Sequence, residues 1–555
     1  MKKPDIKAMT LREKIAQTLL VRQSDLMLRA DRDYKEARGA QEAAEIMKKQ
    51  QFGGLWVHGN VDVNGIDGSL DTSFHFTSQT YRKWLDGIKP SLTYPLLCAN
   101  DAAGIYSYSD VSDYAMGMIV GAADSEELSY RLGACIGQEN RLVGCRWLWT
   151  PVVDLFSPFS GEITRTFSCD AETLTRHAVA FIRGMQSKGV AACAKHFPGR
   201  EPSDPRDNHV VTAKINSSVD EWMEKQGKIF KAMIDEAGVY TIMSGATAFP
   251  AVDGDTKNGR YLPSGLSYNI ITGLLKGKLG FSGVVISDDV TMGGYTSFYE
   301  RDDLYVELLK AGNDVLLGVG VDAVEVIEKG VADGRLSEER IDDACRRVLA
   351  LKERLGLFDE TEDENMTMEE ACAETAHVQQ EIARRGVTLV RNTESFLPVA
   401  KEHIKHVTII AYSHSDEFLP RLETMKKSFE ARGAKVDLRG KLENFTDIQN
   451  VAAKSDLIVY AALVSFHCPK GQPGFYDDVF WALRYAYTLG REKSVGVAFG
   501  YPYIDYDFMD DACTFVNAYM PSCEIQESFV AGVYGEQPFM GKPPYDVTRM
   551  GSIRH

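Results

Sequence analysis

The chain has 555 residues, which is more than one ordinary hydrophobic core accommodates, so at least two domains are expected. Its composition, 44% hydrophobic and 25% charged, is typical of a soluble globular protein. The net charge of −17 argues against nucleic acid and anionic membrane surfaces as partners and favours an uncharged or cationic small molecule.

The amino-terminal segment and the cysteines predict a cytoplasmic protein. Residues 1–22 carry a charge every few positions, unlike the continuous apolar segment of a signal peptide, and no stretch approaches the roughly 20 apolar residues of a membrane span. The ten cysteines are scattered without a C-x-x-C pair, and Cys98, Cys145 and Cys193 lie inside apolar runs. This pattern indicates reduced core cysteines, and neither a disulfide nor a zinc framework.

Eight short apolar runs, each bounded by turn residues, organise the first 355 residues. They are TLLVR at 18–22, GGLWVHG at 53–59, YPLLCAND at 94–101, CRWLWTPVVD at 145–154, GVAACAKHF at 189–197, VYTIMSGA at 239–246, GVVISDD at 283–289 and NDVLLGVG at 313–320. Between them lie segments with apolar residues at three- and four-residue spacing, for example 171–189, 217–238 and 264–280. Near-continuous apolar strands alternating with helices predict a (β/α)8 TIM-like barrel; one irregular or reversed strand would give the same pattern.

Polar residues gather where these apolar runs stop. They are Asn100, Asp101, Asp154, Lys195, His196, Ser244, Asp288 and Asp289. Barrel enzymes build their active sites at the carboxyl ends of the strands, so we expect these side chains at the rim of a pocket. Any one of them could instead cap a helix or solvate a loop, but their common position favours a site.

The pattern restarts after an acidic run at 359–364 and a predicted helix at 366–385. Further strand candidates follow at 386–392, 406–413, 434–440, 455–464 and 494–502, again alternating with helical segments. They predict a smaller, open, doubly wound three-layer αβα domain. The expected organisation is a catalytic barrel over 1–357, a linker and helix over 358–385, and the αβα domain over 386–555. No G-x-G-x-x-G turn follows the first strand of this domain, so no nucleotide is assigned to it; it either walls the barrel pocket or is a structural appendage.

Two segments carry the residue types that proton transfer requires. Side chains alternate across a strand, so at most one of Asp288 and Asp289 faces the barrel axis in a regular strand. The loop after 189–197 contains Asp207-Asn208-His209, and a carboxylate two residues before an imidazole is able to orient it and raise its basicity. A long loop at an active-site rim is usually functional or disordered.

Several motifs in order resemble glycoside hydrolase family 3, in particular its β-N-acetylglucosaminidase branch. They are MTLREKIAQTLLV, WTPVVDL, RTFSCD, AKHFPGR followed by DNH, and VVISDDVTM. The resemblance continues in GVTLVRNTESFLPV and AGVYGEQPFMGKPPYDV, which are similar to the second domain of two-domain members, and so covers nearly the whole chain.

The resemblance implies a retaining β-N-acetylhexosaminidase that removes terminal β-linked N-acetylglucosamine, without metal or cofactor. Asp288 would be the nucleophile that forms a covalent glycosyl-enzyme, and His209 the general acid/base oriented by Asp207. The residues that would hold sugar hydroxyls are Asp101, Arg165, Lys195 and His196.

The sequence departs from the family pattern in two loops. Arg200-Glu201 stands where His-Gly is usual, with one extra residue before Asp207, and 100–107 reads NDAAGIYS where D-x-E-G-G-R is usual. Three other functions remain open: a β-glucosidase or β-xylosidase whose acid/base is a glutamate of the second domain, a glycoside phosphorylase, and a non-catalytic sugar-binding protein. The Asp207–His209 pair argues against the first of these, and the natural substrate and oligomeric state are left undetermined.

Overall fold

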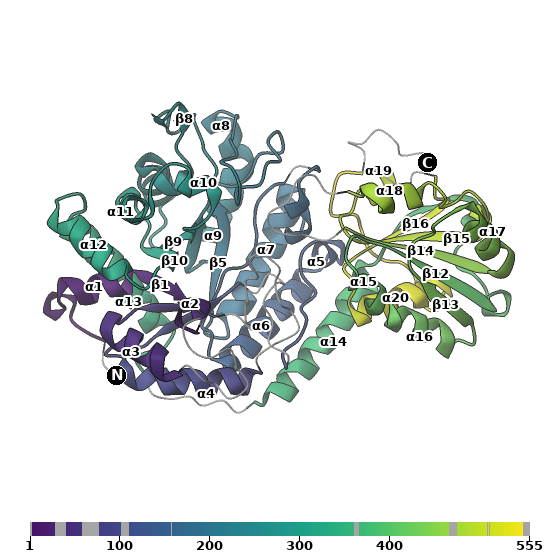
Figure 1. Cartoon of the computed structure of the whole chain (residues 1–555), viewed down its shortest axis with the longest axis horizontal. Coiled ribbons are helices and arrows are strands. Elements are labelled where there is room, and N and C mark those ends of the chain that lie inside the picture. Colours follow the sequence, from purple (N-terminus) through teal and green to yellow (C-terminus); the bar gives the residue numbers. More distant parts are fainter. Residues whose placement is uncertain are drawn as a thin grey trace. The chain divides into compact units, whose positions relative to one another are not determined.

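The computed structural model describes residues 3–27, 40–57, 77–101, 110–156, 158–359, 366–464, 474–507, 509 and 511–547 (Figure 1). The chain forms two compact units. The first comprises residues 1–114, 129–154 and 178–376, and the second comprises 115–128, 155–177 and 377–555. The units therefore interleave along the chain, whereas the domains expected from the sequence are continuous; those boundaries stay a proposal.

The first unit contains the expected barrel. Eight parallel strands close in the order β1-β10-β9-β6-β5-β4-β3-β2. The strands are β1 (Leu19–Arg22), β2 (Gly54–Trp56), β3 (Leu97–Asn100), β4 (Trp147–Leu148), β5 (Ala191–Phe197), β6 (Thr241–Ser244), β9 (Val284–Asp289) and β10 (Val315–Val319). Each lies inside one of the eight apolar runs, and none is reversed, so the predicted fold class is confirmed.

Alternating strand residues fill the barrel interior. Leu20, Leu97, Trp147, Cys193 and Ile286 belong to one buried cluster, as strands with an inward-facing set of side chains require. Helix α13 (Glu338–Arg354) adds Val348 and Leu351 to the same cluster, and Leu355, directly after the helix, adds a third side chain.

An α-helix precedes the first barrel strand, and other helices follow most of the strands. They are α1 (Leu11–Gln17), α2 (Gln23–Met27), α3 (Ala40–Gln50), α4 (Ser78–Ile88), α6 (Glu126–Val143), α7 (Ala171–Gln186), α8 (Val219–Trp222), α9 (Lys228–Asp235), η7 (Asn269–Lys278), α10 (Gly293–Thr296), α11 (Arg301–Ala311), α12 (Ala323–Ala332) and α13. Local sequence explains where some begin: the Thr10 and Glu13 side chains form a capping box that starts α1, and Ser218 and Glu221 do the same for α8. A two-stranded hairpin, β7 (Thr256–Lys257) and β8 (Arg260–Tyr261), was not expected from the sequence.

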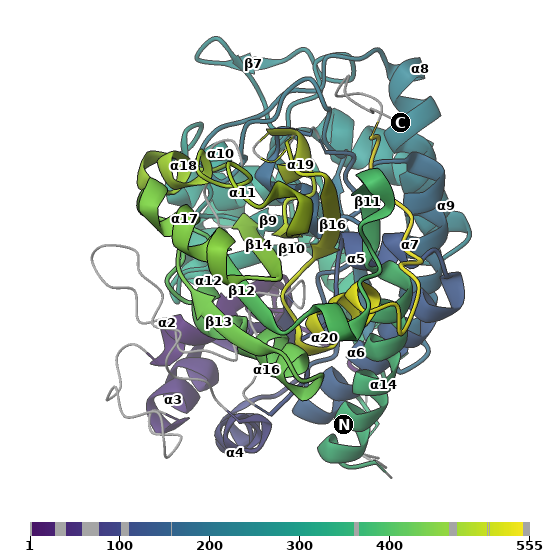
Figure 2. The same ribbon diagram turned by 90° about the vertical axis from the view of Figure 1, so that its right-hand side faces the viewer.

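The second unit is built on a six-stranded sheet in the order β11-β16-β15-β14-β12-β13 (Figure 2). The strands are β11 (Thr388–Asn392), β12 (His406–Tyr412), β13 (Lys435–Arg439), β14 (Leu457–Val464), β15 (Ser494–Gly500) and β16 (Thr514–Tyr519). Every residue of β15 and β16 is buried, which requires cover on both faces of the sheet. The helices of this unit are α5 (Met118–Ala122), α15 (Phe418–Arg421), α16 (Glu423–Ala431), α17 (Phe445–Lys454), α18 (Asp477–Leu483), α19 (Ile504–Asp507) and α20 (Cys523–Val533).

The sheet differs from the sequence prediction in two respects. β16 was not among the expected strands, and β11 pairs antiparallel with it, whereas the other neighbours are parallel. The helix expected at 366–385 is α14 (Met368–Gly386), and 360–364 of the acidic run lie outside the described residues. None of the helices in the described part of the chain combines the length and apolarity that crossing a membrane requires.

Candidate active site

Polar side chains from three strands meet at the carboxyl end of the barrel. Asp101 directly follows β3, Lys195 and His196 lie near the end of β5, and Asp288 and Asp289 end β9. The register between β5 and β6 shifts between Lys195 and Phe197, so regular alternation of side chains does not hold there. The two consecutive residues of β5 therefore both find polar partners at this end of the barrel.

Lys195 and Asp101 form a buried ion pair. The Lys195 side chain is 1% exposed, and its Nζ lies 2.9 and 3.0 Å from the two carboxylate oxygens of Asp101. Burying an ammonium requires such a partner, because an unpaired charge in a low-dielectric interior is costly. The pair presents both a donor and acceptors, which is the combination that a sugar hydroxyl recognises.

His196 lies between two carboxylates. Its Nδ1 is 2.7 Å from Oδ2 of the fully buried Asp154, and its backbone N–H also donates to Asp154. A carboxylate only accepts, so Nδ1 carries the proton, and Nε2 lies 4.0 Å from Oδ2 of Asp288. The sequence marked Asp154 as a residue at a strand end but assigned it no role; the structure shows that it orients His196.

Asp289 is held in a structural ion pair. Nη2 of Arg22, at the end of β1, lies 2.6 Å from both carboxylate oxygens of Asp289, and the Thr291 backbone N–H and hydroxyl donate to the same carboxylate. Burial alone would lower the pKa of Arg22, but the charge of Asp289 and its hydrogen bond raise it above its usual value. Arg22 also packs over the Trp56 ring, at 5.3 Å from its centre.

Asp288 has different surroundings. One oxygen accepts the Asp289 backbone N–H at 2.9 Å, and among the described residues His196 is the basic side chain that comes within 4.0 Å of it. Burial raises the pKa of the Tyr295 phenol well above its usual value, and the negative charge of Asp288 adds to this effect, so a neutral phenol stands near the carboxylate. No arginine or lysine of the described chain pairs with Asp288. Its carboxylate oxygens are therefore better nucleophiles than those of an ion-paired carboxylate such as Asp289.

His209 and Asp207 form a second carboxylate–imidazole pair. Nδ1 of His209 lies 2.6 Å from Oδ1 of Asp207, and the same oxygen accepts the His209 backbone N–H at 2.9 Å. The Asp207 side chain is buried, whereas that of His209 is about one third exposed. The carboxylate fixes the proton on Nδ1, so Nε2 is the nitrogen that exchanges protons with a ligand.

The loop that carries this pair rests on the segment that follows Asp288. The Gly293 N–H donates to the His209 carbonyl at 2.8 Å, and the Gly294 N–H donates to the Asn208 carbonyl at 3.3 Å. A Cβ atom at Gly294 would lie 2.8 Å from the Asn208 oxygen and 2.7 Å from Cβ of Ala246. Glycine is therefore required for this close approach, which ties the position of His209 to the end of β9.

Asn208, between the two members of the pair, anchors the loop from its other side. Its side-chain amide donates to the Thr247 hydroxyl at 2.7 Å, and its carbonyl oxygen accepts the Ala213 N–H at 3.0 Å. The side chain is buried. Sequence reasoning gave Asn208 no role, because its Thr247 partner lies 39 residues further along the chain and only the folded chain brings it close.

The preceding part of the loop closes on itself. Arg200 donates to the Arg206 carbonyl, and the Glu201 carboxylate accepts the Ser217 N–H at 3.1 Å. Asp204 accepts the Lys214 N–H at 2.8 Å and pairs with Arg206. These contacts give the loop a defined conformation; its function stays a prediction.

Two other parts of the expected site lie outside the described residues of the first unit. Arg165 belongs to the second unit, in the short helix η4 (Gly161–Arg165), and its guanidinium lies 3.2 Å from Oε1 of Glu162. Residues 102–107 of the altered NDAAGIYS loop lie outside the described residues. The barrel site thus brings together Asp101, Lys195, His196 and Asp288. The Asp207–His209 loop is hydrogen-bonded to Gly293 and Gly294, at the start of α10.

This arrangement has the residue types that acid–base and nucleophilic chemistry require. It supplies one carboxylate outside any arginine or lysine pair, two imidazoles whose tautomers are set by buried carboxylates, and a lysine–carboxylate pair suited to hydroxyl groups. On the rim of a closed (β/α)8 barrel, these are the parts of a glycosidase. That no metal or cofactor takes part remains a prediction.

Comparison with known proteins identifies the family. The model of the glycosyl hydrolase family 3 N-terminal domain matches residues 10–351. The chain therefore belongs to glycosyl hydrolase family 3, whose members act on carbohydrate substrates, as the sequence motifs indicated.

Similar proteins extend over nearly the whole chain. A β-N-acetylglucosaminidase/β-glucosidase of Cellulomonas fimi is 29% identical over 83% of this chain and 85% of its own length. A solved β-glucoside phosphorylase has a TM-score of 0.82 at 23% identity, over 99% of this chain and 95% of that one. A family 3 β-N-acetylglucosaminidase from Paenibacillus sp. str. FPU-7 has a TM-score of 0.79 at 24% identity, over 98% and 99%. At such identities the two structures establish the shared two-domain fold.

Proposed function

We propose that the protein is a retaining β-N-acetylhexosaminidase, which removes terminal β-linked N-acetylglucosamine through a covalent intermediate on Asp288. The observation that carries this proposal is the His209–Asp207 pair at 2.6 Å, on a loop hydrogen-bonded to the residues just after Asp288. Retention requires a nucleophilic carboxylate and a second group that first donates and then accepts a proton, and these two elements supply both.

In the first step, an Asp288 oxygen attacks the anomeric carbon while the bond from that carbon to the leaving oxygen breaks. Protonated His209 gives the proton on Nε2 to the leaving oxygen and becomes neutral. Asp207 keeps the other ring proton on Nδ1 and stabilises the positive charge that the imidazole carries before transfer. The position of Asp288, outside any arginine or lysine pair of the described chain, favours attack by this carboxylate over Asp289.

In the second step, neutral His209 accepts a proton from a water molecule as the water oxygen attacks the anomeric carbon. The bond to Asp288 breaks, its carboxylate is restored, and the sugar leaves with its original β configuration after two inversions. One imidazole therefore serves as acid and then as base, and the enzyme returns to its starting protonation.

We assign substrate binding to Asp101, Lys195, His196 and Arg165. The Lys195–Asp101 pair offers charged donors and acceptors in a buried setting, where hydrogen bonds to hydroxyls discriminate strongly. His196, held by Asp154, is oriented so that Nε2 lies on the side of Asp288, where the sugar ring must bind. Arg165 is assigned to this set only because the RTFSCD motif, which begins with it, resembles the family's motif.

The choice of sugar is supported by the names of similar proteins. The Cellulomonas fimi relative is named for both N-acetylglucosaminide and glucoside hydrolysis, and the Paenibacillus structure for N-acetylglucosaminide hydrolysis. The test is the ratio of specificity constants for aryl β-N-acetylglucosaminide and aryl β-glucoside, with N-acetylglucosaminide expected to be preferred. A glucoside or xyloside preferred tenfold, about 1.4 kcal/mol in transition-state binding, would overturn the assignment.

Phosphorolysis is the second candidate, favoured by one feature of the site. An imidazole acid/base is neutral at the stage when the second nucleophile arrives, whereas a carboxylate there would repel a phosphate anion. Turnover in the presence and absence of phosphate separates the two reactions by product: free N-acetylglucosamine for hydrolysis, the sugar 1-phosphate for phosphorolysis. A rate that depends on phosphate, with sugar 1-phosphate as the main product, would replace hydrolysis as the function.

A further inference from the structure

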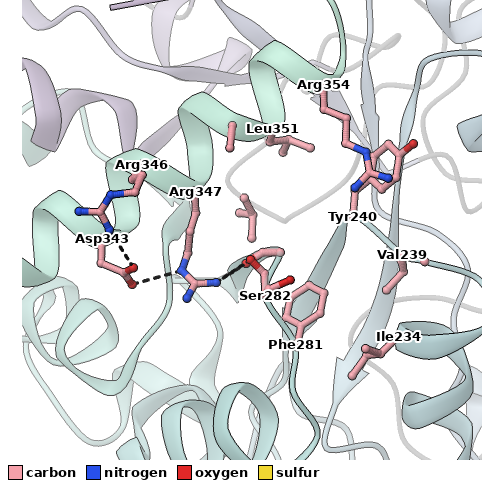
Figure 3. Close-up of a pocket in the computed structure, with 14 residues that line it drawn as sticks. Ile234, Val239, Tyr240, Phe281, Ser282, Asp343, Arg346, Arg347, Leu351 and Arg354 are labelled. Atoms are coloured by element: carbon pink, nitrogen blue, oxygen red, sulfur yellow. Dashed lines mark hydrogen bonds and ion pairs between the residues drawn. The ribbon is translucent and has the colours of Figure 1, made fainter. Parts of the chain in front are cut away.

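A cavity lies in the first unit, at the amino-terminal end of the barrel strands. It has a volume of about 500 Å³. Its wall includes Tyr240, directly before β6, the segment 281–283 directly before β9, and helix α13 (Figure 3). Asp288 lies four residues beyond the first residue of β9, which places it about 13 Å along the strand from this end. The cavity is therefore separate from the candidate active site.

The cavity concentrates positive charge in an acidic protein. Arg346, Arg347 and Arg354 of α13 line it, and the one acidic residue in its wall is Asp343. Asp343 is shared among cations, because it pairs with Arg346 at 3.4 Å, with Arg347 at 3.2 Å and with Arg340 at 2.6 Å. Burial raises the pKa of Asp343, but the charges of Arg347, Arg340 and Lys276 outweigh it and lower the pKa, as expected where positive charge is in excess.

Arg354 is held in place without a carboxylate. Its guanidinium carbon lies 3.7 Å from the centre of the Tyr240 ring, and no described acidic side chain forms an ion pair with it. Figure 3 shows the guanidinium against the Tyr240 ring, on the opposite side of the cavity from Arg346 and Arg347. Stacking fixes the plane of a guanidinium while its N–H donors remain directed outward, the geometry that binds phosphate or carboxylate through two hydrogen bonds.

Arg347 contributes to the shape of the cavity. Its Nη1 donates to the carbonyls of Ser282 and Gly283, at 2.7 and 3.0 Å, and so ties α13 to the segment before β9. The rest of the wall is partly apolar and includes the buried side chains of Phe281 and Leu351. A cavity of this size with an apolar wall and a few convergent polar groups has the character of a small-molecule site.

We propose that this cavity binds a small organic phosphate. The phosphate group contacts the guanidinium of Arg354, and the organic part extends past Phe281 toward Arg346, whose positive charge adds to the attraction. A free phosphate ion would satisfy the arginines but leave the apolar wall without a partner, so an organic phosphate is expected to bind more tightly. This inference is independent of the proposed function, because it concerns binding at the opposite end of the barrel.

The test is isothermal titration calorimetry of the full chain at constant ionic strength, with glucose 6-phosphate, AMP, inorganic phosphate and glucose as probes. The expected result is saturable binding of at least one organic phosphate, tighter than that of inorganic phosphate and tighter than that of glucose. Arg354→Ala and Arg346→Glu are each expected to weaken this binding at least tenfold. The Arg346 side chain is 60% exposed, so the second variant keeps the test valid should the loss of the Tyr240 stack unfold the first.

Arg421→Ala is the matched control, because it removes a surface arginine of α15, 55% exposed, from the second unit. It is expected to bind the probe as the unmodified chain does, and all three variants are expected to keep turnover of an aryl glycoside. The absence of saturable binding to every probe would overturn the proposal. Affinity unchanged in both Arg354→Ala and Arg346→Glu would also overturn it, since the phosphate would then bind elsewhere, including at the active site.

Discussion

Lys352 is a buried lysine at the base of the barrel whose charge should make stability depend on pH. It lies in α13, is fully buried, and donates from Nζ to Oε1 of Gln17 at 2.6 Å and to the Pro95 carbonyl at 2.7 Å. Burial lowers the pKa of Lys352 to about 7, against a weaker opposing effect of Cys345 and Cys98. Its usual value is about 10.4.

The sign of the effect follows from proton binding. Between about pH 7 and pH 10 the unfolded chain keeps the Lys352 proton while the folded chain has released it, so the contribution of Lys352 to the free energy of unfolding rises with pH. The slope approaches about 1.4 kcal/mol per pH unit, and the gain between pH 7 and pH 9 is about 2 kcal/mol because the transition at pH 7 is only half complete. Below pH 6 both states are charged and the contribution stays constant.

Lys352→Met removes this titration. The free energy of unfolding of the unmodified chain minus that of the variant is expected to increase by about 2 kcal/mol from pH 7 to pH 9. Urea unfolding at pH 6, 7, 8 and 9 measures it through the fluorescence of Trp147 and Trp149, which are buried in the barrel. Lys329→Met, which removes an exposed lysine of α12, is the matched control.

The comparison uses the pH slope alone, because the variant also leaves the Gln17 and Pro95 oxygens without a donor, and that loss does not depend on pH. A difference that stays constant from pH 6 to pH 9 would refute the reasoning. It would mean that hydrogen bonds to the Gln17 and Pro95 oxygens compensate for the lost hydration of the Lys352 ammonium, so that it stays charged in the folded chain.

Three further predictions concern the active site. Asp288→Ala is expected to abolish turnover, whereas Asp289→Ala is expected to retain the chemistry and lose about 1–3 kcal/mol of stability as Arg22 loses its partner; labelling with a 2-fluoro glycosyl donor and peptide mapping identifies the nucleophile. His209→Ala is expected to slow substrates with poor leaving groups by about 10²–10⁴-fold and activated aryl glycosides much less, because only the former need the proton; rates across a leaving-group series measure this. Gly294→Ala is expected to lower kcat by about 100-fold with the fold intact, because the added Cβ displaces the Asn208 carbonyl and with it the loop; steady-state kinetics and circular dichroism test it.

Each of these three predictions has a control variant or an outcome that would contradict it. A label on Asp289, or on a glutamate of the second unit, would reject Asp288 as nucleophile. Asp207→Ala is expected to give a milder form of the His209 pattern; equal losses on every leaving group in both variants would assign the loop to binding instead. Gly273→Ala, where the nearest atom to the new Cβ is 3.9 Å away, is the matched control for Gly294→Ala, and equal kinetics in the two would remove the argument from close packing.

The barrel could be predicted from the sequence because its signal is local. All eight strands lie within apolar runs bounded by turn residues, since a parallel strand buried on both faces needs apolar residues at nearly every position. The second sheet was predicted less completely. The segment containing β16 was missed, and the antiparallel pairing of β11 with it depends on a neighbour more than 120 residues away, which no local pattern encodes.

The sequence by itself determined the barrel and the family, and it indicated candidate residues for the proposed reaction, because side-chain chemistry and its position at a strand end are properties of short segments. Tertiary structure alone decided the different surroundings of those candidate residues. Asp288 and Asp289 are adjacent and chemically identical, and they differ because β1 brings Arg22 to one of them and β5 brings His196 near the other. The same holds for Asn208 and Gly294, since hydrogen bonds and close contacts between distant segments exist only once the closed barrel sets the distances between its strands.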